Sequence, residues 1–379
     1  MTPPGAGDEM GHTRRPRPGR IERGVRVVGT LAPVRGARWQ GVSESVGAPC
    51  ARRPRRPAQG GSSRGGNRLS VAQVVGTGAR APVEWSPVEI EEIGEAVSRA
   101  PSVHNSRPWS LTLERRTAVL REDPAMRMQH DPEGRDQRIS CGAALMNMVL
   151  AVRSLGWSAK VELGASGGLV SAAVTVGEPA DPSPREATWA RAIPQRRSHR
   201  QPFSDRPVPE LLREKIWDAA AGTRCGGRWI NADAEAAEVG GMLSRSATAF
   251  QADAGYTREL AEWATPEGKR LRTESEGLRG LAAAGLTAMT TSLPDGSVLA
   301  RVLREEAVLL VGTRGDRAID HLRAGQAVER AWLEATSSGL SVSMMTQPLH
   351  VGEVRTGLAD RLGTSLIPQV IMRFGYPKS

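Results

Sequence analysis

The chain has 379 residues and a net charge of +10, with 51 Lys and Arg against 41 Asp and Glu. The excess lies in residues 1–83, which contain 15 Arg, no Lys and four acidic residues, whereas residues 84–379 contain 36 basic and 37 acidic ones. No nucleic-acid partner is therefore expected, except one bound through the basic leader. No run of about 18 apolar residues occurs, which argues against a membrane-spanning helix and a membrane partner.

Gly and Pro make up 24 of the first 83 residues, and the apolar residues between them follow no helical or strand period. Such a segment cannot bury enough apolar surface to offset its chain entropy, so 1–83 is predicted to be a disordered Arg/Pro/Gly-rich leader. It lacks the pattern of a secretory signal, and a cytoplasmic location is expected. Cys50, Cys141 and Cys225 form no CxxC pair, so neither a zinc site nor a disulfide framework is expected.

Ordered structure is predicted to begin at Ser86-Pro87-Val88-Glu89, which has the residue types of a capping box with Pro in the first helical turn. Pro101 is expected to end this helix. The following segments predict a hairpin, an apolar helix ended by Gly156 and a second hairpin, at 109–113 with 117–121, at 141–155, and at 160–163 with 169–176.

The second half of the chain repeats this plan. Residues 142–157 align without gaps on residues 325–340, at an offset of 183 with five of 16 pairs identical. Pro87-Val88 and Pro207-Val208 precede the first helix of each half at an offset of only 120, so the second half carries 63 additional residues within about 222–306. The alignment indicates a repeat over 84–180 and another over 185–379, although Ala, Gly and Leu are common enough in helices to match by chance.

Two local motifs could carry chemistry. Arg196-Arg197-Ser198-His199-Arg200 places three guanidinium groups and a hydroxyl within five residues, which suits a phosphate-bearing ligand. A solvated loop with weak surface ion pairs explains the same composition. The segment 100–109, Ala-Pro-Ser-Val-His-Asn-Ser-Arg-Pro-Trp, has residue types common in turns, and its Trp could simply belong to the core.

Taken together, Arg-Arg-Ser-X-Arg at 196–200 and Ala-Pro-Ser-X₂-Asn-X₂-Pro-Trp at 100–109 resemble the motifs of the FMN-dependent nitroreductase family. With the duplication, the chain resembles the fused two-repeat, Acg-like branch over about 84–376. The resemblance implies an α+β fold, in which two fused repeats form an intramolecular pseudo-dimer with mixed or antiparallel sheets flanked by helices. The chain would be a monomer of this kind, or a homodimer of it.

In that family FMN binds at a subunit interface, between the Arg motif of one subunit and the Pro-Ser-X₂-Asn turn of the other. Here repeat one has the turn and repeat two has the Arg motif, so the resemblance implies one complete FMN site in each chain. The residues expected to bind FMN are Arg196, Ser198 and Arg200 at the phosphate and ribityl chain, Pro101, Ser102 and Asn105 at the ring or ribityl oxygens, Gln347 within 346–349 near the ring, and Arg373 at the phosphate.

One departure from the family is Arg107, which stands where Gln commonly precedes Pro-Trp. A cation pointing at the flavin ring would favour the anionic reduced flavin and raise its potential. The extra segment includes the apolar stretch 278–290, which is predicted to form a lid over the flavin ring. A helical excursion on the surface is the alternative for that stretch.

The resemblance implies an oxidoreductase that uses NAD(P)H to reduce a nitroaromatic, a quinone or a similar small-molecule acceptor. The alternative is a protein that sequesters or stores FMN without turnover. No residue is assigned as catalytic and no metal is expected, because hydride transfer through a flavin needs a bound cofactor and a stacked substrate. Local hydrogen bonding is expected for His104 and His199, and Cys141 is expected to be a small buried residue.

Overall fold

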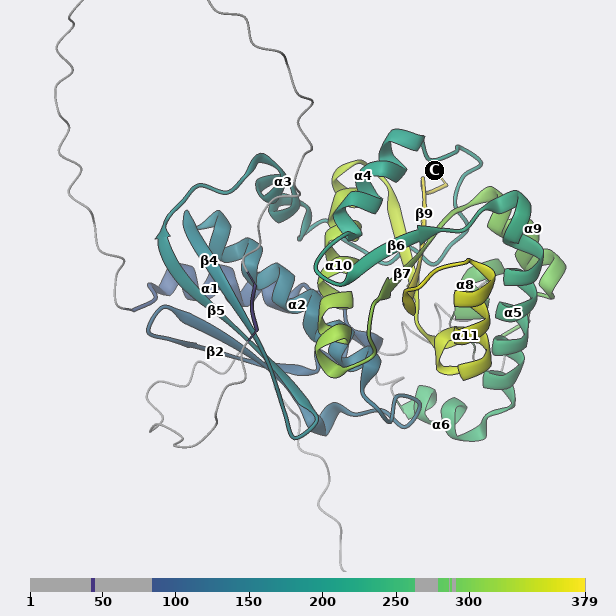
Figure 1. Cartoon of the computed structure of the whole chain (residues 1–379), viewed down its shortest axis with the longest axis horizontal. Coiled ribbons are helices and arrows are strands. Elements are labelled where there is room, and N and C mark those ends of the chain that lie inside the picture. The colour runs from purple at the N-terminus through teal and green to yellow at the C-terminus, as the bar shows by residue number, and fades with distance from the viewer. Residues whose placement is uncertain (1–41, 45–83, 263–278, 286, 288–290, 379) are drawn as a thin grey trace, which may run out of the picture.

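The computed structural model describes residues 42–44, 84–262, 279–285, 287 and 291–378. The fold is α+β, with two antiparallel sheets separated by a pair of long helices (Figure 1). The first sheet has the strand order β1-β4-β5-β3-β2 and the second has the order β6-β7-β9-β8. None of the helices in these ranges is both long and apolar enough to cross a membrane.

The first half contains the predicted helix and both predicted hairpins. Helix α1, Pro87–Ser98, starts at Ser86, whose side chain and that of Glu89 form the reciprocal hydrogen bonds of a capping box. The strands are longer than the segments predicted from sequence. Their backbone hydrogen bonds continue into polar residues, which do not show the alternation of apolar and polar side chains used for the prediction. They are β2 (Trp109–Glu114), β3 (Thr117–Glu122), β4 (Trp157–Ser166) and β5 (Leu169–Pro179), and a short helix, η2, spans Pro124–Met126.

Part of the predicted leader is paired with the first sheet. Strand β1, Val42–Glu44, runs antiparallel to β4 with Val42 opposite Leu163. This short strand differs from the expectation that the whole of 1–83 lacks structure. A free strand edge offers unpaired backbone groups, which a short extended segment can satisfy. The rest of the predicted leader lies outside the described residues.

Helix α2, Arg135–Ser154, begins six residues before the predicted start at Cys141. Its first turn is charged and carries no apolar pattern, so sequence periodicity could not locate it. The carboxylate of Asp131 stabilises this turn by accepting hydrogen bonds from the backbone N–H groups of Arg135, Asp136 and Gln137. The helix therefore starts at a buried cluster of charged residues.

The second half repeats the strand order of the first. The order β6-β7-β9-β8 corresponds strand by strand to β2-β3-β5-β4, and both bounds of α10 lie 183 residues after those of α2. The elements of this half are α3 (Pro184–Ala192), α4 (Glu210–Ala220), β6 (Cys225–Trp229), β7 (Ala307–Thr313), α10 (Ala318–Ser337), β8 (Ser341–Met345), η3 (Gln347–His350), α11 (Gly352–Arg361) and β9 (Ile367–Gly375).

Helices α2 and α10 lie side by side between the two sheets (Figure 1). They approach closest at Gly142 and Gly325, where a Cβ on Gly142 would overlap the carbonyl oxygen of Leu322 and a Cβ on Gly325 would overlap that of Ile139. Leu322 follows Ile139 by 183 residues, so the two contacts are related by the repeat. Only glycine allows the two backbones this approach.

The additional residues of the second half lie between β6 and β7. They form α5 (Ala232–Ala252), α6 (Ala254–Glu262), α8 (Gly280–Gly285) and α9 (Gly296–Glu305), whereas the corresponding strands β2 and β3 are joined by the turn Arg115-Arg116. In β7, Val308 and Leu310 pack with the core of these helices, while Leu309 and Val311 pack with α10. The insertion therefore covers the outer face of the second sheet.

Candidate functional site

The loop that carries the Arg motif is bound to the edge of the second sheet. Ser198 forms a parallel bridge with Val342 in β8, and the His199 backbone N–H donates to the Val342 carbonyl at 2.8 Å. The His199 ring stacks on Phe203 with centroids 5.0 Å apart. These contacts hold residues 198–203 against the fold.

The motif at 100–109 forms a tight turn after α1 that includes η1, Val103–Asn105. His104, Asn105 and Arg107 have φ values of 49°, 55° and 49°, a left-handed conformation that is costly for residues other than glycine. The Ser102 hydroxyl accepts a hydrogen bond from the Arg107 backbone N–H at 3.0 Å, and Ser140 of α2 accepts one from Val103 at 3.2 Å. The turn is thus fixed both internally and against α2.

The structure brings the two motifs together across the halves of the chain. A guanidinium N–H of Arg196 donates to the carbonyl of Arg99, just before the turn, at 3.1 Å. Burial, with His130 and Arg200 nearby, lowers the pKa of His104 to about 4. The Arg loop of one half therefore lies beside the turn of the other.

Gln347 and Arg373 each have a buried donor without a partner among the described residues. The Gln347 side-chain oxygen accepts a hydrogen bond from the backbone N–H of Thr287 at 3.0 Å, while its Nε2 makes none. Arg373 is 1 % exposed and donates to both oxygens of Glu306 at 2.7 Å, which leaves Nη1 unpaired. Unpaired buried donors are unfavourable in a protein alone and suit a ligand with acceptor oxygens.

The other predicted residues differ in exposure. The Arg196 guanidinium lies 4.6 Å over the Trp332 ring, and its Nε is 3.9 Å from Glu329, so this side chain is turned toward α10. Pro101 is buried, whereas Asn105 and Arg107 are exposed. Contact of the predicted residues with FMN remains a prediction, as does the inward orientation considered for Arg107.

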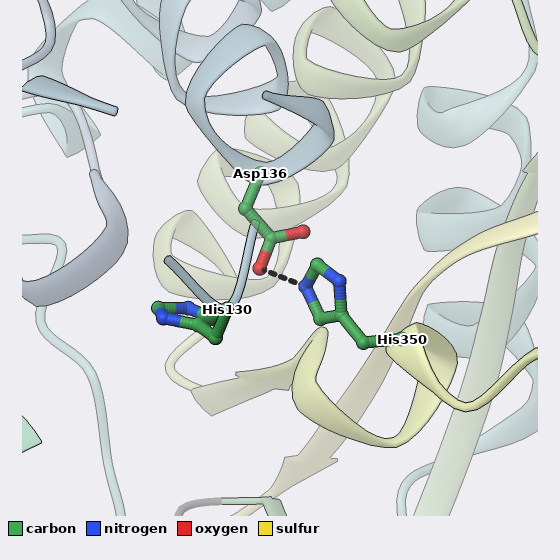
Figure 2. Close-up of side chains that lie close together, drawn as sticks. All are labelled: His130, Asp136 and His350. Carbon is green, nitrogen blue, oxygen red and sulfur yellow. Dashed lines mark hydrogen bonds and ion pairs between the residues drawn. The ribbon is translucent and has the colours of Figure 1, made fainter. Parts of the chain in front are cut away.

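A cluster that sequence reasoning missed lies where α2 begins. His130, Asp136 and His350 have ligand-type atoms within 4.8 Å of one another (Figure 2). His350 Nε2 is 3.0 Å from Asp136 Oδ2, and the Thr346 hydroxyl donates to the same oxygen at 2.5 Å. Burial opposes ionisation of Asp136, but His350 and Arg135 outweigh it and hold its pKa well below the usual range. No local motif marks these residues, because 214 positions separate Asp136 from His350.

A cavity of about 560 Å³ opens beside this cluster. His130 and His350 line it together with Arg135, Phe250 and Arg355. It lies where the loop before α2, the insertion and η3 meet, so residues from both halves of the chain contribute to its wall.

Parts of the chain are similar in sequence to proteins of the nitroreductase family. A model of the nitroreductase family matches residues 193–376, the half that carries the Arg motif. A Mycobacterium tuberculosis H37Rv protein, Rv3131, provisionally named an NAD(P)H nitroreductase, is 31% identical over 294 residues, which cover 73% of this chain and 82% of that protein. The chain belongs to the nitroreductase family. Another M. tuberculosis relative with the same provisional description, acg, is 26% identical over 301 residues, covering 76% of this chain and 88% of its own.

Among solved structures, a nitroreductase with bound FMN from Desulfitobacterium hafniense aligns with a TM-score of 0.34 at 13% identity. It covers 51% of this nitroreductase-family chain and 90% of its own. A nitroreductase with bound FMN from Bacteroides fragilis aligns with a TM-score of 0.33 at 16% identity, covering 50% of this chain and 88% of its own.

Cys141 of this nitroreductase-family chain lies inside α2 and not at its start. Its thiol donates to the carbonyl of Pro108 at 3.4 Å, and burial raises the pKa of the thiol well above its usual range. A buried thiol with a raised pKa is a poor nucleophile. This supports the structural role expected for Cys141.

A buried carboxyl group, that of Glu329, lies between the two halves of the chain. Glu329 of α10 is fully buried, and burial raises its pKa to about 7 against the opposing effect of the Arg196 charge. Because the folded pKa lies above the ordinary value of 4.5, ionisation of Glu329 destabilises the folded state increasingly as pH rises from about 4.5 to about 7.

We expect Glu329→Gln to be more stable than the unaltered protein at pH 8, by an amount on the order of 2–3 kcal/mol, since glutamine keeps the shape and never ionises. At pH 4.5 the two proteins should have nearly equal free energies of unfolding. Urea denaturation at both pH values measures the difference. A stability gain that is the same at both pH values would contradict this explanation.

Proposed function

We propose that this chain is an FMN-dependent oxidoreductase that accepts hydride from NADH or NADPH and reduces a small acceptor such as a nitroaromatic or a quinone. The observation that carries the proposal is the hydrogen bond from the Arg196 guanidinium, in the Arg loop, to the carbonyl of Arg99, just before the turn. The provisional description of its M. tuberculosis relatives as NAD(P)H nitroreductases supports the proposal.

The donors at this junction fit a flavin mononucleotide. Ser198 and Arg200 would hold the phosphate, because hydroxyl and guanidinium groups make strong bonds to phosphate oxygens. Arg373 would contribute its Nη1 group, since Glu306 already accepts from Nε and Nη2. The unpaired Nε2 of Gln347 would face a flavin acceptor, and the turn at 101–105 would contact the ring or the ribityl chain. FMN supplies the ring that receives and passes on the hydride.

The chain's own residues would shape and close the site. Thr287, which follows α8, donates to Gln347, and Gly285 at the end of α8 lies against Met345. This contact supports the proposal that the insertion covers the flavin and restricts which acceptors enter. The remainder of the predicted lid, within 286–290, includes residues outside the described ranges.

We further propose that the chain is a fused pseudo-dimer with one FMN site. The common strand order of the two sheets and the reciprocal approach of Gly142 and Gly325 support this. The second, symmetry-related junction would lack a site, because repeat one has Ala79-Arg80-Ala81-Pro82 in place of the Arg motif and repeat two has Ala219-Ala220-Ala221-Gly222 in place of the turn. A cytoplasmic location stays a prediction.

Anaerobic reduction of the FMN-loaded protein tests the activity. NADH or NADPH should bleach the flavin absorbance, and a nitroaromatic or a quinone should restore it. Bleaching by dithionite but by neither nucleotide would contradict the oxidoreductase and favour the alternative of an FMN-sequestering protein. Failure to bind FMN at all would contradict both functions.

A further inference from the structure

We propose that His130, Asp136 and His350 form a binding site for a divalent transition-metal ion of the zinc type. Two imidazoles and one carboxylate are a set of donors that such ions prefer. The three residues come from the loop before α2, from the first turn of α2 and from η3, so the ion would bind the two halves of the chain together (Figure 2). The proposal does not rest on FMN binding.

The donor atoms converge on one point. His350 Nε2 lies 3.0 Å from Asp136 Oδ2, and all three ligand-type atoms lie within 4.8 Å of one another. Zinc binds nitrogen and oxygen donors at about 2.0–2.2 Å, so two ligands of one ion are at most about 4.2 Å apart. Small side-chain rotations would therefore bring all three atoms into coordination.

A carboxylate is bound to one ring nitrogen of His130. Its Nδ1 lies 2.6 Å from Glu259 Oε2 of α6, and the Glu259 carboxylate also accepts the backbone N–H groups of Gln129 and His130 at 2.5 and 3.0 Å. With Nδ1 bound to Glu259, Nε2 is the ring nitrogen that would coordinate the ion after a rotation of the side chain. A carboxylate behind a ligating histidine is a regular feature of zinc sites, because it fixes the ring and raises its basicity.

Asp136 is divided between structural and ligand roles. Its Oδ1 accepts two hydrogen bonds from the Arg135 guanidinium at 3.3 Å. Its Oδ2 accepts a hydrogen bond from the Thr346 hydroxyl and lies 3.0 Å from His350 Nε2. Oδ2 is therefore the oxygen that would bind the ion. The adjoining Arg135 charge opposes cation binding, but the carboxylates of Asp136 and Glu259 outnumber it.

The cavity beside the cluster supplies access and an open coordination position. The cavity has a volume of about 560 Å³, and both His130 and His350 line it, so water or an oxygen-donor ligand can reach the ion. Three protein ligands with an open fourth position are typical of zinc sites that bind exchangeable ligands.

Equilibrium dialysis of the untagged full chain against Zn²⁺, followed by metal analysis, tests the site. We expect one Zn²⁺ for each chain, with or without FMN loaded. His350→Ala and Asp136→Asn should each weaken binding at least tenfold, and Glu259→Gln about tenfold, the size usual for groups that orient a metal ligand. The same analysis of FMN-free protein separates this result from the outcome of the flavin experiments.

His321→Gln is the matched control, because His321 is also a buried histidine paired with a carboxylate, Asp316, at 2.8 Å, but lies outside the cluster. It should leave Zn²⁺ binding unchanged. Co²⁺ provides a second readout on the unaltered protein, whose visible spectrum should show nitrogen ligation. Absence of stoichiometric Zn²⁺ binding by the unaltered chain, or equal loss in His321→Gln and His350→Ala, would overturn the proposal.

Discussion

An Arg200→Ala variant is expected to bind FMN about 10- to 100-fold more weakly than the unaltered protein. Charge-assisted hydrogen bonds contribute about 1.5–3 kcal/mol each, and this range corresponds to that loss of affinity. The effect should be large because Arg200 lies at the junction of the two halves, close enough to His104 to lower its pKa. Quenching of FMN fluorescence during titration measures the dissociation constant.

Arg197→Ala is the matched control for this variant. Arg197 belongs to the same loop and carries the same charge, but it is exposed and donates to the carbonyls of Pro194 and Arg196. Its removal should change FMN affinity less than about threefold, as expected for an exposed charge. Equal losses in the two variants would indicate a general effect of loop charge and contradict a specific role for Arg200.

A Gly325→Ala variant is expected to lose about 3 kcal/mol or more of its free energy of unfolding. The new Cβ would overlap the carbonyl oxygen of Ile139 and lie against Gly142, and both are backbone groups that no side-chain rotation can move. Helices α2 and α10 would have to separate, which disturbs the packing along their whole contact. Urea denaturation followed by circular dichroism measures the loss.

Gly352→Ala provides the comparison for this change. Gly352 begins α11, its φ is not positive, and a Cβ there would meet no atom within 4 Å. Because alanine also favours the helix, this variant should be as stable as the unaltered protein or up to about 1 kcal/mol more stable. A Gly325→Ala variant that unfolds within about 0.5 kcal/mol of the unaltered protein would show that the two helices do not require glycine at their crossing.

Sequence patterns were sufficient for the elements whose signals are local. The capping box at Ser86 and the alternation in both hairpins lie within a few residues of each other, and the structure has the corresponding elements. The 183-residue offset also located α10 relative to α2. The resemblance at 100–109 and 196–200 identified the family that the relatives support.

Features that depend on distant contacts could not be predicted in this way. Strand β1 forms because β4, far along the chain, offers a free edge. The difference between the two repeat offsets predicted 63 additional residues in the second half. It could not predict that they lie between two paired strands, β6 and β7. The cluster of His130, Asp136 and His350 is assembled only when the halves pack together.

FMN titration of the unaltered chain, read at its endpoint, tests the central claim most directly. The proposed single junction between the Arg loop and the turn predicts saturation at one FMN for each chain. The chain's oligomeric state should not alter this ratio. Saturation at two FMN for each chain, or at one FMN for every two chains, would contradict a single complete site within one fused chain.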